Sequence, residues 1–189
     1  SVEAGEDYPL DLSPFMERKK VLMTCGTQLA WAKENLIYQA TQLAKAHPDC
    51  HFFVTRGVGG EAFQCEKLME NLSVVSYLPY KEYIPQMDYV IHHGGAGIFY
   101  QCIIYGKPAL ILPHDYDQFD YAVRGVEAGV ALSANKEDTR AIGQAFDNLL
   151  AKEDWSELET LCQAAQSYHP TEILESEIHR LLADKEKEK

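Results

Sequence analysis

The sequence lacks the excess of basic residues and the long apolar runs that mark whole classes of proteins. Its 17 Lys and Arg residues stand against 29 Asp and Glu residues, which gives a net charge of −12. A field of this sign repels nucleic-acid phosphates and acidic membrane surfaces, so we expect no nucleic acid as a partner. No run of about 18 apolar residues occurs, so the sequence predicts no transmembrane segment.

Cysteines are also few, and they form no recognisable motif. Five occur, an odd number without a Cys-x-x-Cys pair, at Cys25, Cys50, Cys65, Cys102 and Cys162. This pattern favours neither a disulfide framework nor a zinc site, and it is typical of a reducing compartment. We therefore predict a cytoplasmic protein without a bound metal. The start of the sequence shows no signal-peptide pattern.

Length and composition predict one folded domain. The chain has 189 residues, of which 46% are hydrophobic and 24% charged, a balance that supports one sizeable core. Residues 1–20 are polar and contain Pro9 and Pro14, so we predict a linker that enters the domain. The domain itself is expected over residues 21–184, and residues 185–189 form a charged tail that we expect to fray.

Short apolar runs alternate with stretches of helical spacing along the domain. The predicted strands cover residues 21–24, 51–55, 74–78, 89–92, 108–112 and 130–132. The predicted helices cover residues 29–47, 98–105 and 119–128, and a helical region from residue 138 onward is interrupted at Pro170. Continuous apolar strands that alternate with helices predict a Rossmann-like α/β fold, a doubly wound parallel sheet with helices on both faces.

A glycine-rich loop stands where such a fold binds its ligand, beyond the carboxyl end of a strand. It runs from His93 to Gly97, and Gly26 and Gly57 also follow predicted strands. Glycine lets the backbone approach a ligand closely, and the helix that follows offers free N–H groups and a positive dipole end. This combination is typical of a phosphate site that needs no lysine. A tight turn without a ligand would have the same sequence.

A second polar loop follows the predicted strand 108–112. Asp117 and Gln118 stand in it just before the next predicted helix. Their side chains are suited either to cap that helix or to bind vicinal hydroxyl groups, and the sequence leaves both options open. His114 and Asp115 precede them. No nucleophile pattern stands nearby, so we expect both residues to shape the ligand pocket rather than to act as an acid and a base.

Five other residues have a mainly structural interpretation. We expect His92 as a packed strand residue, Cys25 as a small buried residue, and Trp31 and Trp155 as aromatic side chains that pack on helices. Arg56 ends the second predicted strand at the ligand edge. It either meets a phosphate or forms a surface ion pair.

Together these segments resemble the donor-binding motif of the UDP-glycosyltransferase family and of its bacterial relatives that glycosylate antibiotics. The similarity runs from about Lys20 to about Ala134, in the family's order and spacing. The matching segments are Val21–Gln28, Tyr77–Pro79, His93–Gly97, Gly106–Pro108, Pro113–Gln118 and the positions Ala122, Arg124 and Gly129.

The resemblance implies the C-terminal lobe of a two-lobed enzyme of the GT-B type. In such enzymes this lobe binds the sugar nucleotide, while an N-terminal lobe binds the acceptor and supplies the general base. The implied function is the donor-binding domain of an inverting glycosyltransferase that uses a UDP- or dTDP-sugar with no cofactor and no metal. We expect no catalytic residue in this chain, which by itself would be inactive. Residues 1–20 resemble the connection between the two lobes.

The resemblance also implies which residues hold the diphosphate. His93 would contact it directly, and Gly95, Ala96 and Gly97 would offer backbone amides from the loop and the start of the helix. Thr27, at the turn after the first strand, would touch the phosphate or the sugar.

The remaining implied contacts concern the base, the ribose and the sugar. Tyr77 would lie against the base, whose edge the Leu78 backbone would read. Gln101 would reach the ribose. Asp117 and Gln118 would bind the hydroxyl groups of the sugar.

Three positions depart from the family's pattern. Ile98, the next donor-binding position after the glycine loop, stands where Ser or Thr is usual, so one hydroxyl donor is lost at a cost of about 1 kcal/mol. Gln101 stands where Glu is usual, and an amide offers one acceptor oxygen where a carboxylate offers two. Tyr80 stands where Gln is usual. These departures leave the identity of the donor open.

Three other interpretations fit the same residues. In the first, the chain is a separate donor-binding subunit of a two-subunit transferase, with an exposed apolar face that awaits its partner. In the second, it is a UDP-sugar 2-epimerase, which needs acid and base carboxylates in the cleft and fits the Asp117-Gln118 pair less well. In the third, it is a degenerate, non-catalytic nucleotide-sugar-binding module, which Ile98 and Gln101 favour.

Overall fold

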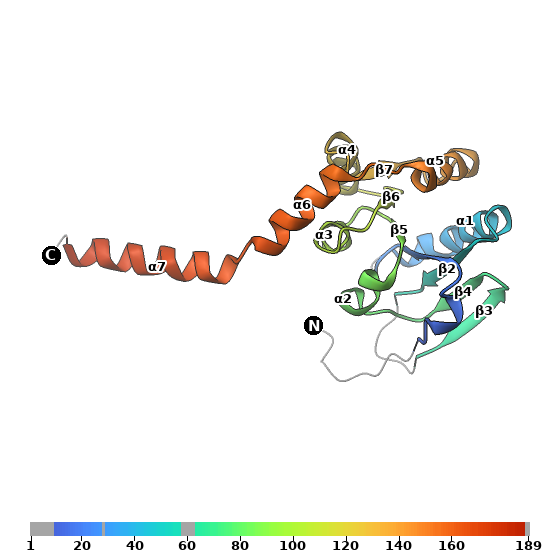
Figure 1. Cartoon of the computed structure of the whole chain (residues 1–189), viewed down its shortest axis with the longest axis horizontal. Helices are drawn as coiled ribbons and strands as arrows, with labels where there is room; N and C mark the ends of the chain where they lie inside the picture. Colours follow the sequence, from blue (N-terminus) through green and yellow to red (C-terminus); the bar gives the residue numbers. More distant parts are fainter. Residues whose placement is uncertain (1–9, 28, 58–62, 188–189) are drawn as a thin grey trace.

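The computed structural model describes residues 10–27, 29–57 and 63–187, and a seven-stranded sheet lies at its centre (Figure 1). The strand order is β3-β4-β2-β1-β5-β6-β7, and every neighbouring pair is parallel except β3 with β4. The predicted Rossmann-like α/β fold is confirmed. The strands are β1 Lys19–Thr24, β2 Cys50–Thr55, β3 Cys65–Met69, β4 Leu72–Val75, β5 Tyr89–His92, β6 Ala109–Ile111 and β7 Ala131–Ser133.

Strand β1 lies in the middle of the sheet and sets its register. Val21 stands opposite Phe52 of β2 and opposite Tyr89 of β5. All six residues of β2 are buried, because helices cover both faces of the sheet. Burial on both faces is the physical reason why this strand contains the apolar run Phe52–Val54.

Strand β3 is missing from the sequence-based prediction. It is an antiparallel edge strand, and four of its five residues are exposed. A strand that faces water on both sides needs no apolar run, so its sequence carries no clear strand pattern. The predicted third strand also ends earlier than expected, at Val75, which leaves Tyr77 and Leu78 in the segment after β4.

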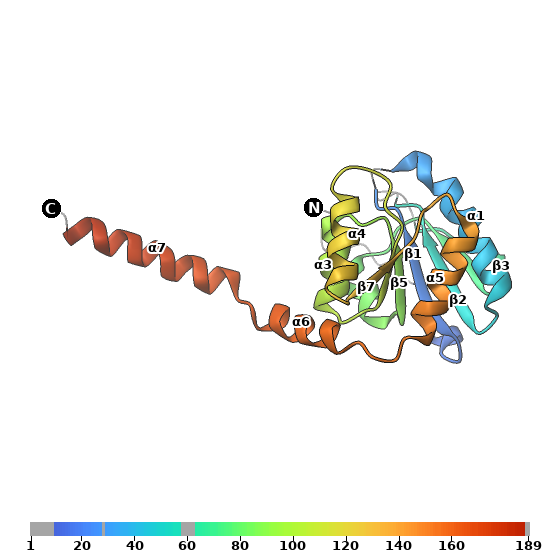
Figure 2. The ribbon, with the colours of Figure 1, turned by 90° about the horizontal axis from the view of Figure 1, so that it is seen from above.

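The helices form one layer on each side of the sheet (Figure 2). Helices α1 (Lys33–Ala46) and α5 (Thr139–Ala151) cover one face. Helices α2 (Tyr80–Tyr83), α3 (Ala96–Ile104) and α4 (Gln118–Glu127) cover the other. Short 3-10 turns at Ser13–Phe15, Ala30–Ala32 and Ile84–Gln86 lead into or out of these elements.

Two buried clusters hold the helical layers on the sheet. On the side of α1 and α5, the rings of Phe52 and Phe146 lie 5.6 Å apart. On the other side, Phe53, Ile98 and Phe99 belong to one buried cluster. Adjacent residues of β2 thus face opposite layers, and burial of each such side chain contributes roughly 1.5–3 kcal/mol.

The chain ends in two helices, α6 (Ser156–Ser167) and α7 (Pro170–Lys187). Helix α7 extends away from the sheet and its helical layers (Figures 1 and 2). Pro170 is the first residue of α7, as expected for a proline that cannot continue the preceding helix. The predicted interruption at this residue is therefore confirmed, whereas the helix continues into the charged tail as far as Lys187. Among the described residues, no helix is long and apolar enough to cross a membrane.

The predicted linker, residues 1–20, is only partly described. Residues 1–9 lie outside the described residues. In the described part, Phe15 packs against His51 and Phe53 of β2, with ring centroids 4.0 and 5.2 Å away. Strand β1 then begins at Lys19, two residues earlier than expected. The segment before β1 therefore covers part of the sheet as well as leading into it.

Candidate functional site

A cavity of about 800 Å³ lies at the carboxyl edge of the parallel strands, a volume within the range of small-molecule sites. Segments that follow β4, β2, β1, β5 and β6 all contribute to its walls. This is the edge at which the sequence predicted a ligand, because each glycine-rich stretch follows a strand. The lining residues are Cys25, Gly26, Thr27, Leu29, Trp31, Thr55, Gly57, Tyr77, Tyr80, His93, Gly95, Ala96, Gly97, Ile98, Asp115, Tyr116, Asp117 and Gln118.

The loop between β5 and α3 forms a sharp corner in this cavity. Gly94 has a φ of +90°, and a Cβ there would lie 3.0 Å from the carbonyl oxygen of Gln118, so only glycine fits. Gly95 is the residue before the helix and has no side chain that could cap it. The amides of Ala96, Gly97 and Ile98 therefore have no acceptor within the helix, and all three residues line the cavity.

The ring of His93 closes the corner from the side of β1. A Cβ on Gly95 would lie 2.5 Å from Nε2 of this ring, and a Cβ on Gly26 would lie 2.9 Å from its Cε1. Both positions are glycine because the imidazole occupies the space of a side chain. Burial lowers the pKa of His93, and the neighbouring His114 lowers this pKa further. The ring is thus a neutral hydrogen-bonding group rather than a fixed cation.

His92, the neighbouring histidine, is part of the core, which confirms the prediction. Its side chain is buried, and its Nδ1 accepts a hydrogen bond from the amide of Gly94 at 3.0 Å. Burial lowers the pKa of His92 to about 3, so the ring is neutral and Nε2 carries the proton. This bond fixes the backbone at the point where the corner turns.

A group of hydroxyls is centred on the buried Thr24 at the end of β1, and two of its members, Thr55 and Tyr80, line the cavity. Thr24 Oγ1 accepts a hydrogen bond from the amide of Gly26 at 3.0 Å. The same oxygen shares hydrogen bonds with the Tyr80 hydroxyl at 2.9 Å and with Thr55 Oγ1 at 3.1 Å. Burial raises the pKa of Tyr80 to about 12, so its proton stays in place. The sequence signal for this group was the pair of threonines at the ends of β1 and β2, which the strand register places opposite each other.

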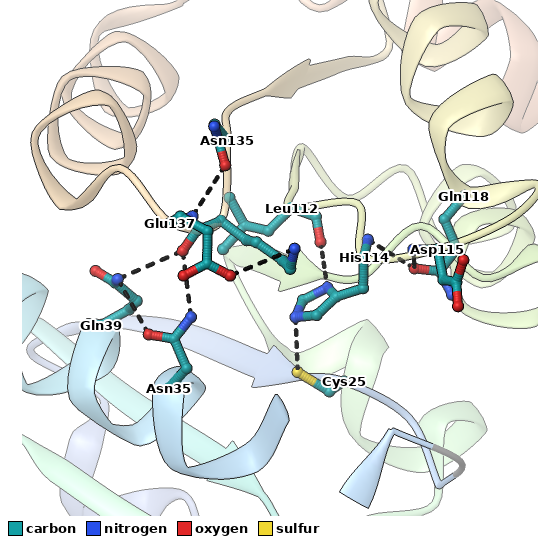
Figure 3. A network of polar contacts seen from close by, with 10 residues as sticks. Cys25, Asn35, Gln39, Leu112, His114, Asp115, Gln118, Asn135 and Glu137 are labelled. Atoms are coloured by element: carbon teal, nitrogen blue, oxygen red, sulfur yellow. Dashed lines mark hydrogen bonds and ion pairs between the residues drawn. The ribbon is translucent and has the colours of Figure 1, made fainter. Parts of the chain in front are cut away.

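The loop between β6 and α4 is held by Gln118 rather than by Asp117 (Figure 3). Gln118 Oε1 accepts hydrogen bonds from the amides of His114 at 2.9 Å and Asp115 at 3.1 Å. Asp117 occupies the N-cap position of α4, but its side chain makes no capping hydrogen bond. The sequence left open whether Asp117 caps the helix or binds hydroxyl groups. Asp117 does not cap the helix, and this exposed residue lines the cavity.

His114 connects the ends of β6 and β1 across β5 (Figure 3). Its Nδ1 donates to the carbonyl oxygen of Leu112 at 2.7 Å, and its Nε2 lies 4.0 Å from the sulfur of Cys25. With the proton on Nδ1, Nε2 is the acceptor for the thiol. Burial raises the pKa of Cys25 to about 12, so the thiol keeps its proton and can donate it. Cys25 is buried, as the sequence predicted.

Trp31 corrects one expectation. Its side chain was expected to pack on a helix, but it is 64% exposed and lines the cavity. It stands in the 3-10 turn before α1, at the carboxyl edge of the sheet where the cavity lies. Its ring meets the ring of His114 edge-on, with centroids 5.7 Å apart.

Most of the predicted site residues come together in this cavity. Nine of them line it: Thr27, Tyr77, His93, Gly95, Ala96, Gly97, Ile98, Asp117 and Gln118. Leu78 and Gln101 do not. The Leu78 side chain is fully buried in the core, and Gln101 lies one helical turn beyond Gly97, with its Oε1 buried and without a hydrogen-bond partner in the described part of the chain.

Two further observations concern the Arg56 side chain and possible metal ligands. Arg56 forms an exposed ion pair with Glu66 at 3.3 Å, the surface alternative of the two that the sequence left open. It does not line the main cavity. Within the described ranges, no cluster of three or more His, Cys, Asp or Glu residues has the arrangement of a metal site.

Comparisons with known proteins agree with this architecture. A family model described as "Erythromycin biosynthesis protein CIII-like, C-terminal domain" matches residues 59–179. The structure also resembles that of spinosyn rhamnosyltransferase SpnG in complex with thymidine diphosphate. The TM-score is 0.76 at 18% identity, over 91% of this chain and 48% of that protein.

Two curated relatives illustrate the similarity in sequence. The 3-alpha-mycarosylerythronolide B desosaminyl transferase of Saccharopolyspora erythraea is 29% identical over 121 residues, 61% of this chain and 28% of the relative. UDP-glucosyltransferase A1 of Starmerella bombicola is 24% identical over 170 residues, 88% of this chain and 37% of the relative. The chain thus spans less than half the length of these proteins. It belongs to the family of erythromycin biosynthesis protein CIII-like C-terminal domains, and the relatives named above are glycosyltransferases.

Proposed function

We propose that this chain binds the sugar nucleotide of a glycosyltransferase, with the diphosphate at the corner between β5 and α3. The observation that carries the proposal is the set of amides at Ala96, Gly97 and Ile98, which have no acceptor among the described residues and belong to the lining of a cavity of suitable size. The positive end of the helix dipole adds to their attraction for an anion. The His93 ring lies against the same corner and supplies one more hydrogen-bonding group.

Backbone groups must do most of this work, because the cavity is not basic. Its described lining contains Asp115 and Asp117 but no Lys or Arg. Amides of a helix start carry only partial charge, yet they point at the anion and need no counter-ion. This explains how a protein with a net charge of −12 would hold a diphosphate.

The order of the strands suggests the order of the ligand's parts. Tyr77 and Tyr80 follow β4 at one end of the cavity, His93 and its loop follow β5 near the middle, and Asp117 lies beyond β6 at the other end. From β4 to β6 there are four strand spacings, or about 19 Å at about 4.8 Å each. A base, a diphosphate and a hexose would lie along this edge in the order in which a nucleotide sugar joins them.

The ribose would lie beside α3, between the base and the diphosphate. A Cβ on Gly97 would meet no atom within 4 Å, so space is open beside this residue at the start of α3. Gln101 lies one turn farther along α3, and its buried Oε1 has no hydrogen-bond partner among the described residues. The side chain of Ile98 packs into the core, so this residue offers its amide alone.

The chemical step that we propose is a direct inverting displacement with a UDP- or dTDP-sugar. An acceptor oxygen attacks the anomeric carbon, the bond from that carbon to the diphosphate oxygen breaks, and a general base takes the acceptor proton. The diphosphate leaves onto the amides of α3. The base and the acceptor site would belong to an N-terminal lobe, in the same chain or in a partner subunit. The relatives support this proposal, since their names include a UDP-glucosyltransferase and a desosaminyl transferase, and SpnG was solved with thymidine diphosphate.

Titration calorimetry and thermal unfolding with UDP and dTDP test the proposal. A ligand that binds the folded state at a hundredfold excess over its Kd adds about 2.7 kcal/mol to the free energy of unfolding. We expect such stabilisation by at least one of the two nucleotides and a large loss in the variant His93→Ala. The control is His179→Ala, at an exposed position on α7. No binding of either nucleotide at millimolar concentration, or full binding by His93→Ala, would refute the assignment.

A further inference from the structure

The cavity contains an exposed indole that the proposed nucleotide contacts leave unused. Trp31 is 64% exposed, although large aromatic side chains usually bury most of their surface. The other tryptophan of the chain, Trp155, is partly buried, donates its Nε1–H to the carbonyl oxygen of Lys152 and carries the Lys152 ammonium 4.3 Å above its ring. Trp31 thus presents an apolar surface at the cavity that the described residues leave largely exposed.

One neighbouring ring helps to orient this indole. The rings of Trp31 and His114 lie edge to face at an interplanar angle of 63°. The orientation of His114 is in turn fixed by its hydrogen bond to Leu112 and by its contact with Cys25 (Figure 3). A ligand that stacks on Trp31 therefore meets a ring that is already oriented, which lowers the entropy lost on binding.

Polar groups suited to hydroxyls line the same end of the cavity. The carboxylate of Asp117 makes no capping bond, and Gln118 uses its Oε1 within the loop, which leaves its Nε2 as a donor. The loop residue Tyr116 precedes them in the chain and also lines the cavity. It is 85% exposed and has a φ of +49°, a conformation that costs a bulky residue roughly 1–2 kcal/mol. A strained residue at the wall of a cavity is a frequent mark of a ligand site.

A pyranose ring matches this combination of groups. Its hydroxyls lie around the edge and need donors and acceptors, while its C–H groups form a less polar face that packs on an aromatic ring. Trp31 contacts His114, and the backbone amide of His114 donates to Gln118 Oε1, so the indole lies beside the loop that carries Asp117 and Gln118. This is the end of the cavity at which the sugar of the donor would lie.

We infer that Trp31 is the stacking platform for the hexosyl ring of the donor, with Asp117 and the Nε2 of Gln118 binding the hydroxyls of that ring. This inference rests on the proposed function, and it adds a determinant of sugar affinity on the segment between β1 and α1. The platform acts on the hexosyl group and leaves the affinity for the nucleoside diphosphate unchanged.

The test compares each nucleoside diphosphate with its glucose conjugate. Calorimetry gives Kd for UDP, UDP-glucose, dTDP and dTDP-glucose on the unaltered chain and on the variants Trp31→Ala and Trp31→Phe. We expect Trp31→Ala to weaken the sugar conjugates about three- to tenfold and to leave the free diphosphates unchanged, since one aromatic contact is lost. Trp31→Phe should retain part of the effect. The matched control is Tyr38→Ala, an exposed aromatic residue on α1 outside the cavity, which should change neither ligand.

The outcomes separate this inference from the proposed function. If Trp31→Ala weakens diphosphates and conjugates equally, or neither of them, Trp31 is not a sugar platform although the nucleotide site stands. If no nucleotide binds the unaltered chain, both proposals fall. A second readout is acrylamide quenching of Trp31 fluorescence in a Trp155→Phe background. UDP-glucose or dTDP-glucose should protect the indole and the matching diphosphate should not, and equal protection by both would overturn the inference.

Discussion

Replacing Gly95 by Ala should weaken nucleotide binding without unfolding the protein. Gly95 has a φ of −63° and a ψ of 144°, which alanine adopts freely, so the backbone itself permits the change. The new Cβ, however, would lie 2.5 Å from Nε2 of His93, about 1 Å inside normal contact, so the imidazole must move. The substitution thus acts on the position of a neighbouring side chain.

The size of the effect follows from what the ring loses. A hydrogen bond to a charged group contributes about 1.5–3 kcal/mol, so displacement of His93 should raise the Kd for UDP or dTDP about ten- to hundredfold. The stability of the fold should change much less. Alanine is a poorer N-cap than glycine by about 0.5–1 kcal/mol, a loss that urea denaturation would measure.

A double-mutant cycle gives the decisive measurement. Once His93→Ala has removed the ring, Gly95→Ala has nothing to displace, so its effect on Kd should nearly vanish in that background. The control is Gly143→Ala on α5, where an added Cβ meets no atom within 4 Å and binding should be unchanged. Additive effects of the two changes at the corner, or unaltered binding by Gly95→Ala alone, would show that the ring does not contact the ligand.

Three further predictions follow from the described contacts. Burial lowers the pKa of His51 to about 4 and that of His92 to about 3, below the unfolded value of about 6.5. Below that value the unfolded chain binds more protons than the folded chain. Each of the two histidines should therefore lower the free energy of unfolding by about 2 kcal/mol at pH 5 relative to pH 7. Urea denaturation at both pH values measures this difference. Equal stability at the two pH values would contradict it. Tyr80→Phe removes a hydrogen bond to Thr24 and should lower the free energy of unfolding by about 1 kcal/mol, whereas an unchanged denaturation midpoint would show that the bond contributes nothing. Gln101→Glu should lower the Kd for UDP if this position reaches the ribose hydroxyls, and calorimetry that finds no change would place the ribose elsewhere.

The strand and helix pattern was largely predictable because burial is recorded in consecutive residues. Strand β2 is buried on both faces, so it contains an uninterrupted apolar run, Phe52–Val54, that the sequence shows directly. Edge strand β3 faces water, and helix α2 spans four residues, so neither leaves a long periodic signal. The prediction failed where the sequence pattern no longer reflects burial.

The glycine corner is a local structure, and the sequence alone determined it. Its parts stand within six consecutive residues, His93–Ile98, so the turn and the free helix amides depend on neighbouring backbone geometry. The roles of Gly26 and Trp31 were decided by the tertiary structure. Gly26 meets the His93 ring because β1 pairs with β5. Trp31 follows β1 and His114 follows β6, and the two rings meet because these strands lie on either side of β5. Contacts between residues so far apart in the chain depend on strand order, and no local sequence pattern encodes that order.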